Sequence, residues 1–189
     1  MKLSGLFRNL FTALLVLGTL PAFAAAGDTR DPYTHFFNQS LGDFSEELAV
    51  AREEGKKGIL IFFEMDECPF CHRMKRTVLN QPQVQDWYRV HFLNFTVDIE
   101  GDTELVDFQG RAMIAKDFAV KVNRVRATPV FAFYDLEGRQ VFRFTGATRD
   151  RKEFLWMGEF VVDGHYLNTN FTRFKRAKRA AERRAGLAR

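Results

Sequence analysis

The sequence predicts one α/β domain built on a central mixed β-sheet that is flanked by helices. Three observations lead to this prediction: the apolar run 59–63 does not alternate, a helical segment and a second strand-like run follow it, and two later strand-like runs are separated by a Glu137-Gly138 turn. A strand–helix–strand unit pairs its strands in parallel, whereas a short turn pairs them antiparallel. The 189 residues, 46% hydrophobic and 28% charged, suffice for one buried core.

The amino-terminal half of the expected domain alternates helices and strands. Phe44, Leu48 and Ala51 recur at helical spacing, and Gly55 follows them as a stop. The continuous apolar run 59–63 is typical of a strand that is covered on both faces. The expected elements are a helix over 43–54, a strand over 59–63, a helix over 68–79, a short helix over 84–90 and a strand over 91–98.

The carboxy-terminal half is expected to contain a hairpin and a closing helix. Residues 100–111 are acidic and rich in turn formers, which predicts a solvated loop with a small hairpin around Gln109-Gly110. The remaining expected elements are a helix over 112–122, antiparallel strands over 130–134 and 140–144, and a helix over 150–164. Aromatic residues on the predicted strands are expected to fill the core rather than stack on nucleic-acid bases, namely Phe62, Phe63, Phe92, Phe131 and Phe133.

The amino terminus has the pattern of a secretory signal peptide. Lys2 and Arg8 precede the apolar stretch 10–20, which is too short to span a bilayer and is followed by PAFAAAG. We expect a signal peptide over 1–26, cleaved near residues 24–26, and a mature chain in an oxidising compartment such as the periplasm. Retention of the segment as an uncleaved anchor is the alternative. The other expected units are an amino-terminal lead over 27–40, the folded domain over 41–168 and a basic tail over 169–189.

The charge of the chain is divided between an acidic body and a basic tail. Residues 27–172 hold 18 basic and 23 acidic residues, a net charge of −5, whereas residues 173–189 hold eight basic residues and Glu182, a net charge of +7. The body therefore has no basis for a nucleic-acid groove. The tail is expected to be a frayed, solvated terminus. Alternatively, Phe171 and Phe174 anchor it as an amphipathic helix on anionic lipid or an acidic protein.

The chain has only two cysteines, Cys68 and Cys71, and their spacing demands a chemical reason. A separation of three would arise by chance in about 1% of random placements. Two cysteines cannot form a multi-disulfide scaffold, and the four histidines show no zinc-binding spacing. We therefore expect no metal and no cofactor other than the cysteine pair itself. Sulfurs one helical turn apart can reach disulfide geometry. Because the loop between them is very short, the disulfide gains little stability from loop closure, and we expect it to form and break reversibly.

The two cysteines are expected to have different roles because they occupy different places on the helix. Cys68 opens the helix, where unpaired backbone N–H groups and the positive end of the helix dipole stabilise a thiolate. We predict that Cys68 is the nucleophile. Cys71 lies one turn deeper and is predicted to be less exposed and to resolve the mixed disulfide by attacking Cys68.

Several segments of the sequence resemble a thioredoxin-fold protein over about residues 41–164. They are ILIFFE, the CPFC helix start, VDIEGD, TPVFAFYD and VFRFTG. The lead SLGDFSEELAVAREEGKKGILIFFE and the loop DIEGDTELVDFQG look most like exported SoxW-like thioredoxins. The resemblance implies that Pro129 is cis and that the Thr128 backbone contacts an extended substrate segment beside the sulfurs. It also implies a protein-disulfide reductase that a membrane thiol–disulfide carrier re-reduces.

The sequence departs from familiar thioredoxins in two places. Their CGPC with a preceding Trp is here CPFC preceded by Glu67, and their buried acid six residues before the first cysteine is here Phe62. Glu64 falls on the same face of the strand as Phe62 by period-2 parity and is a candidate proton acceptor for Cys71. A solvated glutamate at the strand end is the alternative interpretation.

The residues around the cysteines are expected to modulate the direction of electron flow. Asp66 and Glu67 oppose a thiolate at Cys68 and favour a reducing protein, whereas His72, Arg73 and the helix dipole act in the opposite direction. Two residues between the cysteines belong to the same modulating group, namely Pro69 and Phe70.

We therefore predict a periplasmic thiol–disulfide oxidoreductase, with protein disulfides as substrates and no nucleic-acid partner. Reductase is favoured over disulfide oxidase or isomerase of the same fold. Two alternatives of other classes use the same residues. Cys68 to His72 also matches the CxxCH signature of covalent haem attachment in an electron-transfer protein, and the cysteine pair could be a structural disulfide or a non-catalytic metal or thiol carrier.

Overall fold

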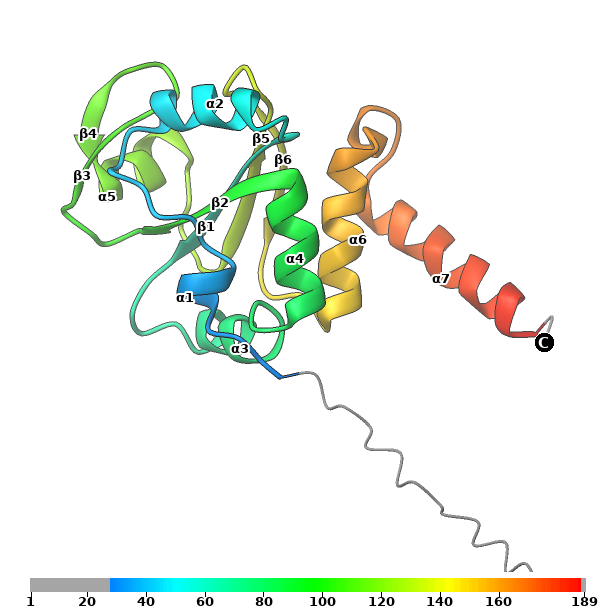
Figure 1. The fold of residues 1–189 in the computed structure, drawn as a ribbon. Helices are drawn as coiled ribbons and strands as arrows, with labels where there is room; N and C mark the ends of the chain where they lie inside the picture. Colours follow the sequence, from blue (N-terminus) through cyan, green and yellow to red (C-terminus); the bar gives the residue numbers. More distant parts are fainter. Residues whose placement is uncertain (1–27, 188–189) are drawn as a thin grey trace, which may run out of the picture.

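The computed structural model describes residues 28–187, which form a four-stranded mixed sheet covered by helices on both faces (Figure 1). The strand order is β2-β1-β5-β6. Strand β1 (Gly58–Glu64) runs parallel to β2 (Phe92–Asp98) and antiparallel to β5 (Val130–Tyr134). Strand β5 in turn pairs antiparallel with β6 (Gln140–Thr145). The predicted fold class is therefore confirmed. The expected signal peptide over 1–26 lies outside the described residues.

The helices divide between the two faces of the sheet. Within the described residues, no helix is long and apolar enough to cross a membrane. One face carries α1 (Pro32–His35), α3 (Pro69–Thr77), α4 (Pro82–His91), α6 (Arg151–Val162) and α7 (Phe171–Leu187). The other face carries α2 (Phe44–Glu53), α5 (Ala115–Asp117), the π-helix η1 (Phe118–Val122) and the small hairpin of β3 (Glu104–Val106) and β4 (Ala112–Ile114). A short 3-10 helix, η2 (His165–Leu167), joins α6 to α7.

Strand β1 contributes to both hydrophobic cores, which explains its unbroken apolar sequence. Leu60 and Phe62 pack in the core beneath α3, α4 and α6, while Ile59, Ile61 and Phe63 pack in the core beneath α2 and η1. All five side chains are fully buried. The prediction that the strand aromatics fill the core is confirmed, because Phe62, Phe63, Phe92, Phe131 and Phe133 show no exposed surface.

The predicted helix boundaries hold in most places. Asp43 and Asp150 cap α2 and α6 through their carboxylates, as the sequence of each helix start suggests. The helix expected over 84–90 extends to His91, so that β2 begins at Phe92.

The helix expected over 112–122 is wrong in its first turn. Residues 112–114 form β4, which pairs antiparallel with β3, and helical structure begins only at Ala115. The expected hairpin around Gln109-Gly110 is confirmed. Asp107 closes it by accepting hydrogen bonds from the N–H groups of Gln109 and Arg111, at 2.9 and 3.0 Å. Cross-strand pairing therefore outweighs the helical pattern of the sequence at this point.

The solvated acidic loop is also only partly correct. Glu100, Asp102 and Glu104 are exposed, but the Asp107 side chain is fully buried. Burial would raise the pKa of the Asp107 carboxyl, yet its hydrogen bonds with Arg111 lower the pKa below the ordinary value.

The expectation of a frayed carboxy-terminal tail is wrong. Residues 171–187 form helix α7, and the hydrophobic core continues past residue 168 into this helix. Phe171 and Phe174 are buried beside Phe160, with ring centroids 5.4 and 5.3 Å from its ring. These two phenylalanines pack on the body, so they are not free to anchor the helix in lipid. Their aromatic surface stabilises a segment whose charge pattern alone suggests a solvated end.

Candidate functional site

The two cysteines lie directly beyond the carboxyl end of β1. Strand β1 ends at Glu64, and after a three-residue turn Cys68 becomes the N-cap of α3, with Pro69 at the first helical position. Cys68 and Cys71 form a disulfide bond, with their Cα atoms 5.2 Å apart. The expectation that one helical turn brings the two sulfurs together is confirmed.

At the start of α3, a backbone N–H group donates a hydrogen bond to the Cys68 sulfur. The backbone N–H of Cys71 donates a hydrogen bond to Sγ of Cys68 at 3.0 Å. In the reduced protein, this N–H and the positive end of the α3 dipole would stabilise a thiolate at Cys68. Of the two cysteines, only Cys68 has surface access, with 3% of its area exposed against none for Cys71.

The residues that border Cys68 are exposed. Glu67, Pro69 and Phe70 lie at the surface, and Phe70 has 60% of its area exposed. His72 is exposed as well, and its Nε2 lies 2.8 Å from the backbone oxygen of Asp66. This contact holds the His72 ring against the turn that precedes Cys68.

Pro129 lies at the same edge of the sheet as the cysteines. The Thr128–Pro129 peptide bond is cis, as the resemblance implied. The next residue, Val130, pairs with Phe63 of β1, one residue before β1 ends. The Pro129 carbonyl accepts a hydrogen bond from the N–H of Gly146 at 2.8 Å, which ties the loop after β6 to this edge. A contact between the Thr128 backbone and a substrate remains a prediction.

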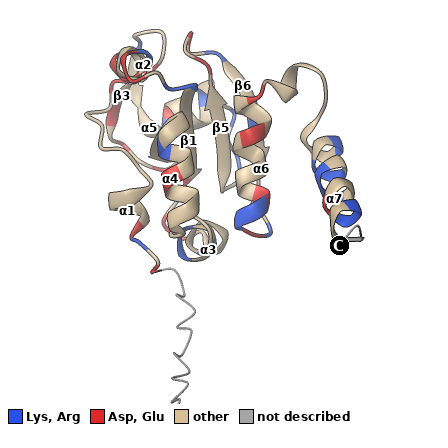
Figure 2. Cartoon of the chain, turned by 45° about the vertical axis from the view of Figure 1, so that its right-hand side comes forward, with Lys and Arg blue, Asp and Glu red and all other residues tan. Residues whose placement is uncertain are grey.

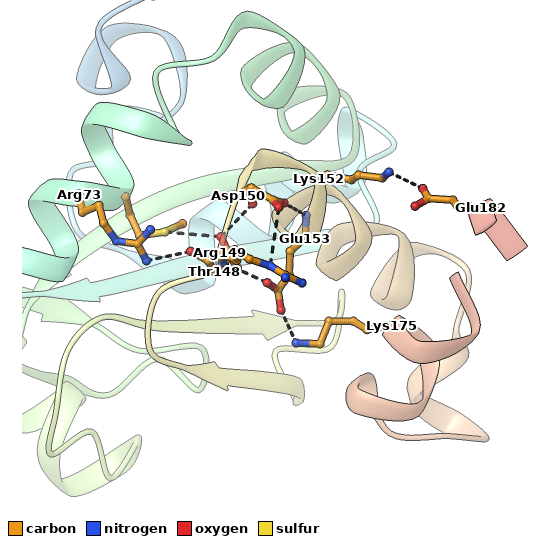
Figure 3. Close-up of polar contacts among 9 residues, drawn as sticks. Arg73, Thr148, Arg149, Asp150, Lys152, Glu153, Lys175 and Glu182 are labelled. Carbon is orange, nitrogen blue, oxygen red and sulfur yellow. Dashed lines mark hydrogen bonds and ion pairs between the residues drawn. The ribbon is translucent and has the colours of Figure 1, made fainter. Parts of the chain in front are cut away.

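A polar network links α3 to the loop after β6 and to α6 and α7 (Figure 3). The Arg73 guanidinium on α3 donates to the backbone oxygen of Thr148 at 2.9 Å. The next N–H along the loop, that of Arg149, donates to Glu153 Oε2 at 3.0 Å, and Lys175 from α7 donates to Glu153 Oε1. Each link joins residues at least four positions apart in the chain, so local sequence patterns did not predict the network.

The pKa of Glu153 reflects this network. Burial would raise the pKa of the Glu153 carboxyl, but the hydrogen bonds from Lys175 and from the Arg149 N–H outweigh burial and lower the pKa below its ordinary value. Glu153 is therefore a buried carboxylate that joins α7 to the loop beside Pro129.

Glu64 lies at the end of β1, but it is not the solvated strand-end residue of the alternative interpretation. Its side chain is 11% exposed, and its Oε2 accepts a hydrogen bond from Lys75 of α3 at 2.6 Å. Its Oε1 accepts a hydrogen bond from the Thr96 hydroxyl of β2 at 2.6 Å. The ion pair ties the helix that carries the cysteines to the end of β1.

Lys75 also contacts Tyr33, which extends this cluster to α1. Its ammonium donates to the Tyr33 hydroxyl and lies 4.9 Å from the centroid of the Tyr33 ring. Burial alone would lower the pKa of Lys75, but its hydrogen bonds to Glu64 and Tyr33 raise the pKa above its ordinary value. Lys75 therefore remains charged over the whole neutral range. Among the described residues, no group of three or more His, Cys, Asp or Glu side chains could hold a metal ion.

Comparisons with known proteins agree with this architecture. A family model for a thioredoxin-like domain matches residues 44–161, which begins at α2 and ends in α6. A thioredoxin-fold protein from Helicobacter pylori superposes with a TM-score of 0.58 at 22% identity, over 67% of this chain and 87% of that chain. A protein from Bacteroides thetaiotaomicron, described as a candidate disulphide-isomerase, superposes with a TM-score of 0.50 at 25% identity, over 67% of this chain and 95% of that chain. No curated protein matches the sequence.

Loss of the Glu64–Lys75 ion pair is expected to destabilise the folded protein. Lys75→Met should lower the free energy of unfolding by about 3 kcal/mol, because it leaves the largely buried Glu64 carboxylate without its cation. Urea denaturation at pH 7 measures this change. Because the folded-state pKa of Lys75 is raised, the difference from the wild type should persist below about pH 10.4 and shrink as the pH rises through the folded-state pKa.

A surface ion pair provides the matched control. Lys121 pairs with Asp117 at 2.8 Å, but the Lys121 side chain is 73% exposed, and Lys121→Met should change stability by less than about 1 kcal/mol. Equal effects of the two substitutions would show that burial does not strengthen the Glu64–Lys75 pair.

Proposed function

The chain belongs to the thioredoxin-like domain family, and from this premise we propose that it is an exported protein-disulfide reductase that acts through Cys68 and Cys71. The single observation that carries the proposal is the cysteine pair at the start of α3, where the Cys71 N–H already donates to the Cys68 sulfur. The family and the CxxC pair together make the protein a thiol–disulfide oxidoreductase. The reducing direction, the periplasmic location and the SoxW-like subgroup belong to this proposal.

The proposed reaction starts from the reduced protein. The Cys68 thiolate attacks one sulfur of a substrate disulfide, and the other substrate sulfur leaves as a thiolate. Cys71, deprotonated, then attacks Cys68 Sγ, and the second substrate thiolate leaves. The substrate disulfide has gained two electrons and the Cys68–Cys71 dithiol has lost them, which yields the disulfide present in the structure. A membrane thiol–disulfide carrier returns the two electrons and restores the dithiol.

Charges around Cys68 support the reducing direction. Asp66 and Glu67 are exposed immediately before the nucleophile, and their negative charge disfavours a thiolate there. The Arg73 guanidinium, which would oppose this effect, is held at the Thr148 carbonyl at 2.9 Å. A thiolate that is less stabilised makes the dithiol a stronger reductant.

Export is proposed from the amino-terminal sequence. The basic residues Lys2 and Arg8, the apolar stretch 10–20 and the alanine-rich segment that follows have the order of a signal peptide. The Cys68–Cys71 disulfide is compatible with an oxidising compartment such as the periplasm.

Substitution of each cysteine should separate the two proposed roles. Cys71→Ser should accumulate a mixed disulfide between Cys68 and a substrate, because the resolving thiol is gone. Cys68→Ser should abolish insulin reduction and trap nothing. Non-reducing electrophoresis followed by mass spectrometry identifies the trapped proteins. Insulin reduction that survives in Cys68→Ser would contradict the dithiol mechanism.

Removal of the acidic charges before Cys68 should make the protein more oxidising. In the double variant Asp66→Asn/Glu67→Gln, the pKa of Cys68 should fall and the reduction potential should rise by about 10 to 30 mV, because the thiolate loses two repulsive neighbours. Equilibration with glutathione buffers measures the potential. The control Glu53→Gln removes an exposed acid at the far end of α2 and should leave the potential unchanged. An unchanged potential in the double variant would remove the electrostatic argument for a reductase.

Glu64 is proposed to accept the Cys71 proton during resolution. It is a carboxylate at the end of β1, in the strand whose Phe62 packs in the same core as Cys71. Glu64→Gln should then slow resolution by about tenfold or more, measured by stopped-flow decay of a preformed mixed disulfide. Lys75→Met is the matched control, since it disturbs the same ion pair but keeps the carboxylate. If Glu64→Gln resolves at the wild-type rate, the residue serves only to hold α3 against β1.

A further inference from the structure

Helix α7 lies outside the matched thioredoxin-like region and carries seven basic residues against one acidic residue, Glu182 (Figure 2). Its lysines and its arginines lie on different sides of the helix. Lys175 pairs with Glu153 and Lys178 pairs with Glu159, both on α6, while the acidic residue Glu182 pairs with Lys152 at 2.7 Å. The two lysines therefore face the body and are neutralised by it.

The arginines of α7 face away from the body. Within residues 28–186, none of them takes part in an ion pair, and four of the five are exposed. At 100° per residue they fall within an arc of about 140° on the side of the helix opposite Phe171 and Phe174. These arginines, defined here as the arginine face, are Arg173, Arg176, Arg179, Arg183 and Arg184.

The arginine face is already formed in the folded protein. Phe171 and Phe174 are buried, and the three ion pairs to α6 fix the rotation of α7 about its own axis. Arg173 and Arg184 are eleven residues apart, which corresponds to about 16 Å along the helix. A partner would therefore meet a preformed row of guanidinium groups and would not have to order a flexible tail.

The composition of this face favours a surface of phosphate groups over a folded protein partner. At the centre of protein interfaces, arginines are usually accompanied by large aromatic side chains that fill desolvated pockets. Between the arginines lie only small residues, such as Thr172 and Ala180. Guanidinium groups bind phosphate oxygens through paired hydrogen bonds, which requires no apolar pocket.

The negative charge of the rest of the molecule would orient the protein on an anionic surface. The body over residues 27–172 has a net charge of −5, so an anionic surface repels it and attracts only α7. We propose that the arginine face of α7 is a docking surface for an anionic phospholipid bilayer. The contact is electrostatic, with the phenylalanines of α7 retained in the core and the helix resting on the headgroups.

Vesicle binding by the full chain tests this proposal. The partition coefficient is measured for vesicles of phosphatidylcholine alone and with about 30% phosphatidylglycerol, at about 0.1 M and 1 M salt. All proteins share the same amino-terminal segment with Lys2 and Arg8, so its contribution cancels when the preferences of the variants are compared. The wild type should prefer the anionic vesicles at low salt and lose the preference at high salt.

The decisive variant is Arg176→Gln/Arg179→Gln/Arg183→Gln. In this variant the ratio of the two partition coefficients should fall by about 100-fold, because each arginine near an anionic leaflet contributes about fivefold. The matched control Lys57→Gln/Arg89→Gln/Lys116→Gln removes the same charge from exposed positions on the body and should keep the preference. Both variants should reduce insulin at the wild-type rate, so loss of docking is distinguishable from loss of the thiol chemistry.

Three outcomes would overturn the assignment. The first is an equal preference for anionic vesicles in the wild type and the α7 variant, which would place the site elsewhere. The second is a preference that does not change with salt. The third is a wild-type protein that ignores anionic vesicles yet binds polyglutamate through the arginine face, which would make the partner an acidic protein.

Discussion

Burial of β1 on both faces is the constraint from which the candidate site follows. Its side chains alternate between two hydrophobic cores, so a shift of one residue would exchange the side chains that pack in each core and disrupt the packing of both. The carboxyl end of this strand is thereby fixed beside the carboxyl end of β2 and beside Val130 of β5. The chain must turn there, and the turn places Cys68 at the N-cap of α3. A thiol in that place meets unpaired backbone N–H groups, which is what its chemistry requires.

Polar contacts then hold the elements around the cysteines in place. Glu64 and Lys75 connect β1 to α3, and Gly146 connects the loop after β6 to Pro129. Arg73 joins α3 to the same loop from the other side. The site thus combines β1 and α3 with two segments that are distant in the chain, Pro129 and the loop after β6. Each contact satisfies a group that would otherwise be costly to bury.

Helix α7 shows how one basic segment can serve two purposes. Its lysines pair with acidic residues of α6, and its phenylalanines extend the core, so the helix becomes part of the fold. Its arginines lie on the outer side of the helix and form no ion pairs within residues 28–186. A strongly basic tail therefore need not be a disordered one, and its free charge is smaller and better oriented than its composition implies.

The sequence by itself determined the α/β class, the order of most elements, the cysteine pair and its helix start, because these depend on local periodicity, turn residues and spacing. It also placed Glu64 on the correct strand face. Only the tertiary structure decided that residues 112–114 form a strand, that Asp107 and Glu64 are buried and paired, and that Phe171 and Phe174 belong to the core. In each case the deciding partner lies in a different element, and the free energy of burying or pairing a side chain depends on that partner rather than on neighbours in the sequence.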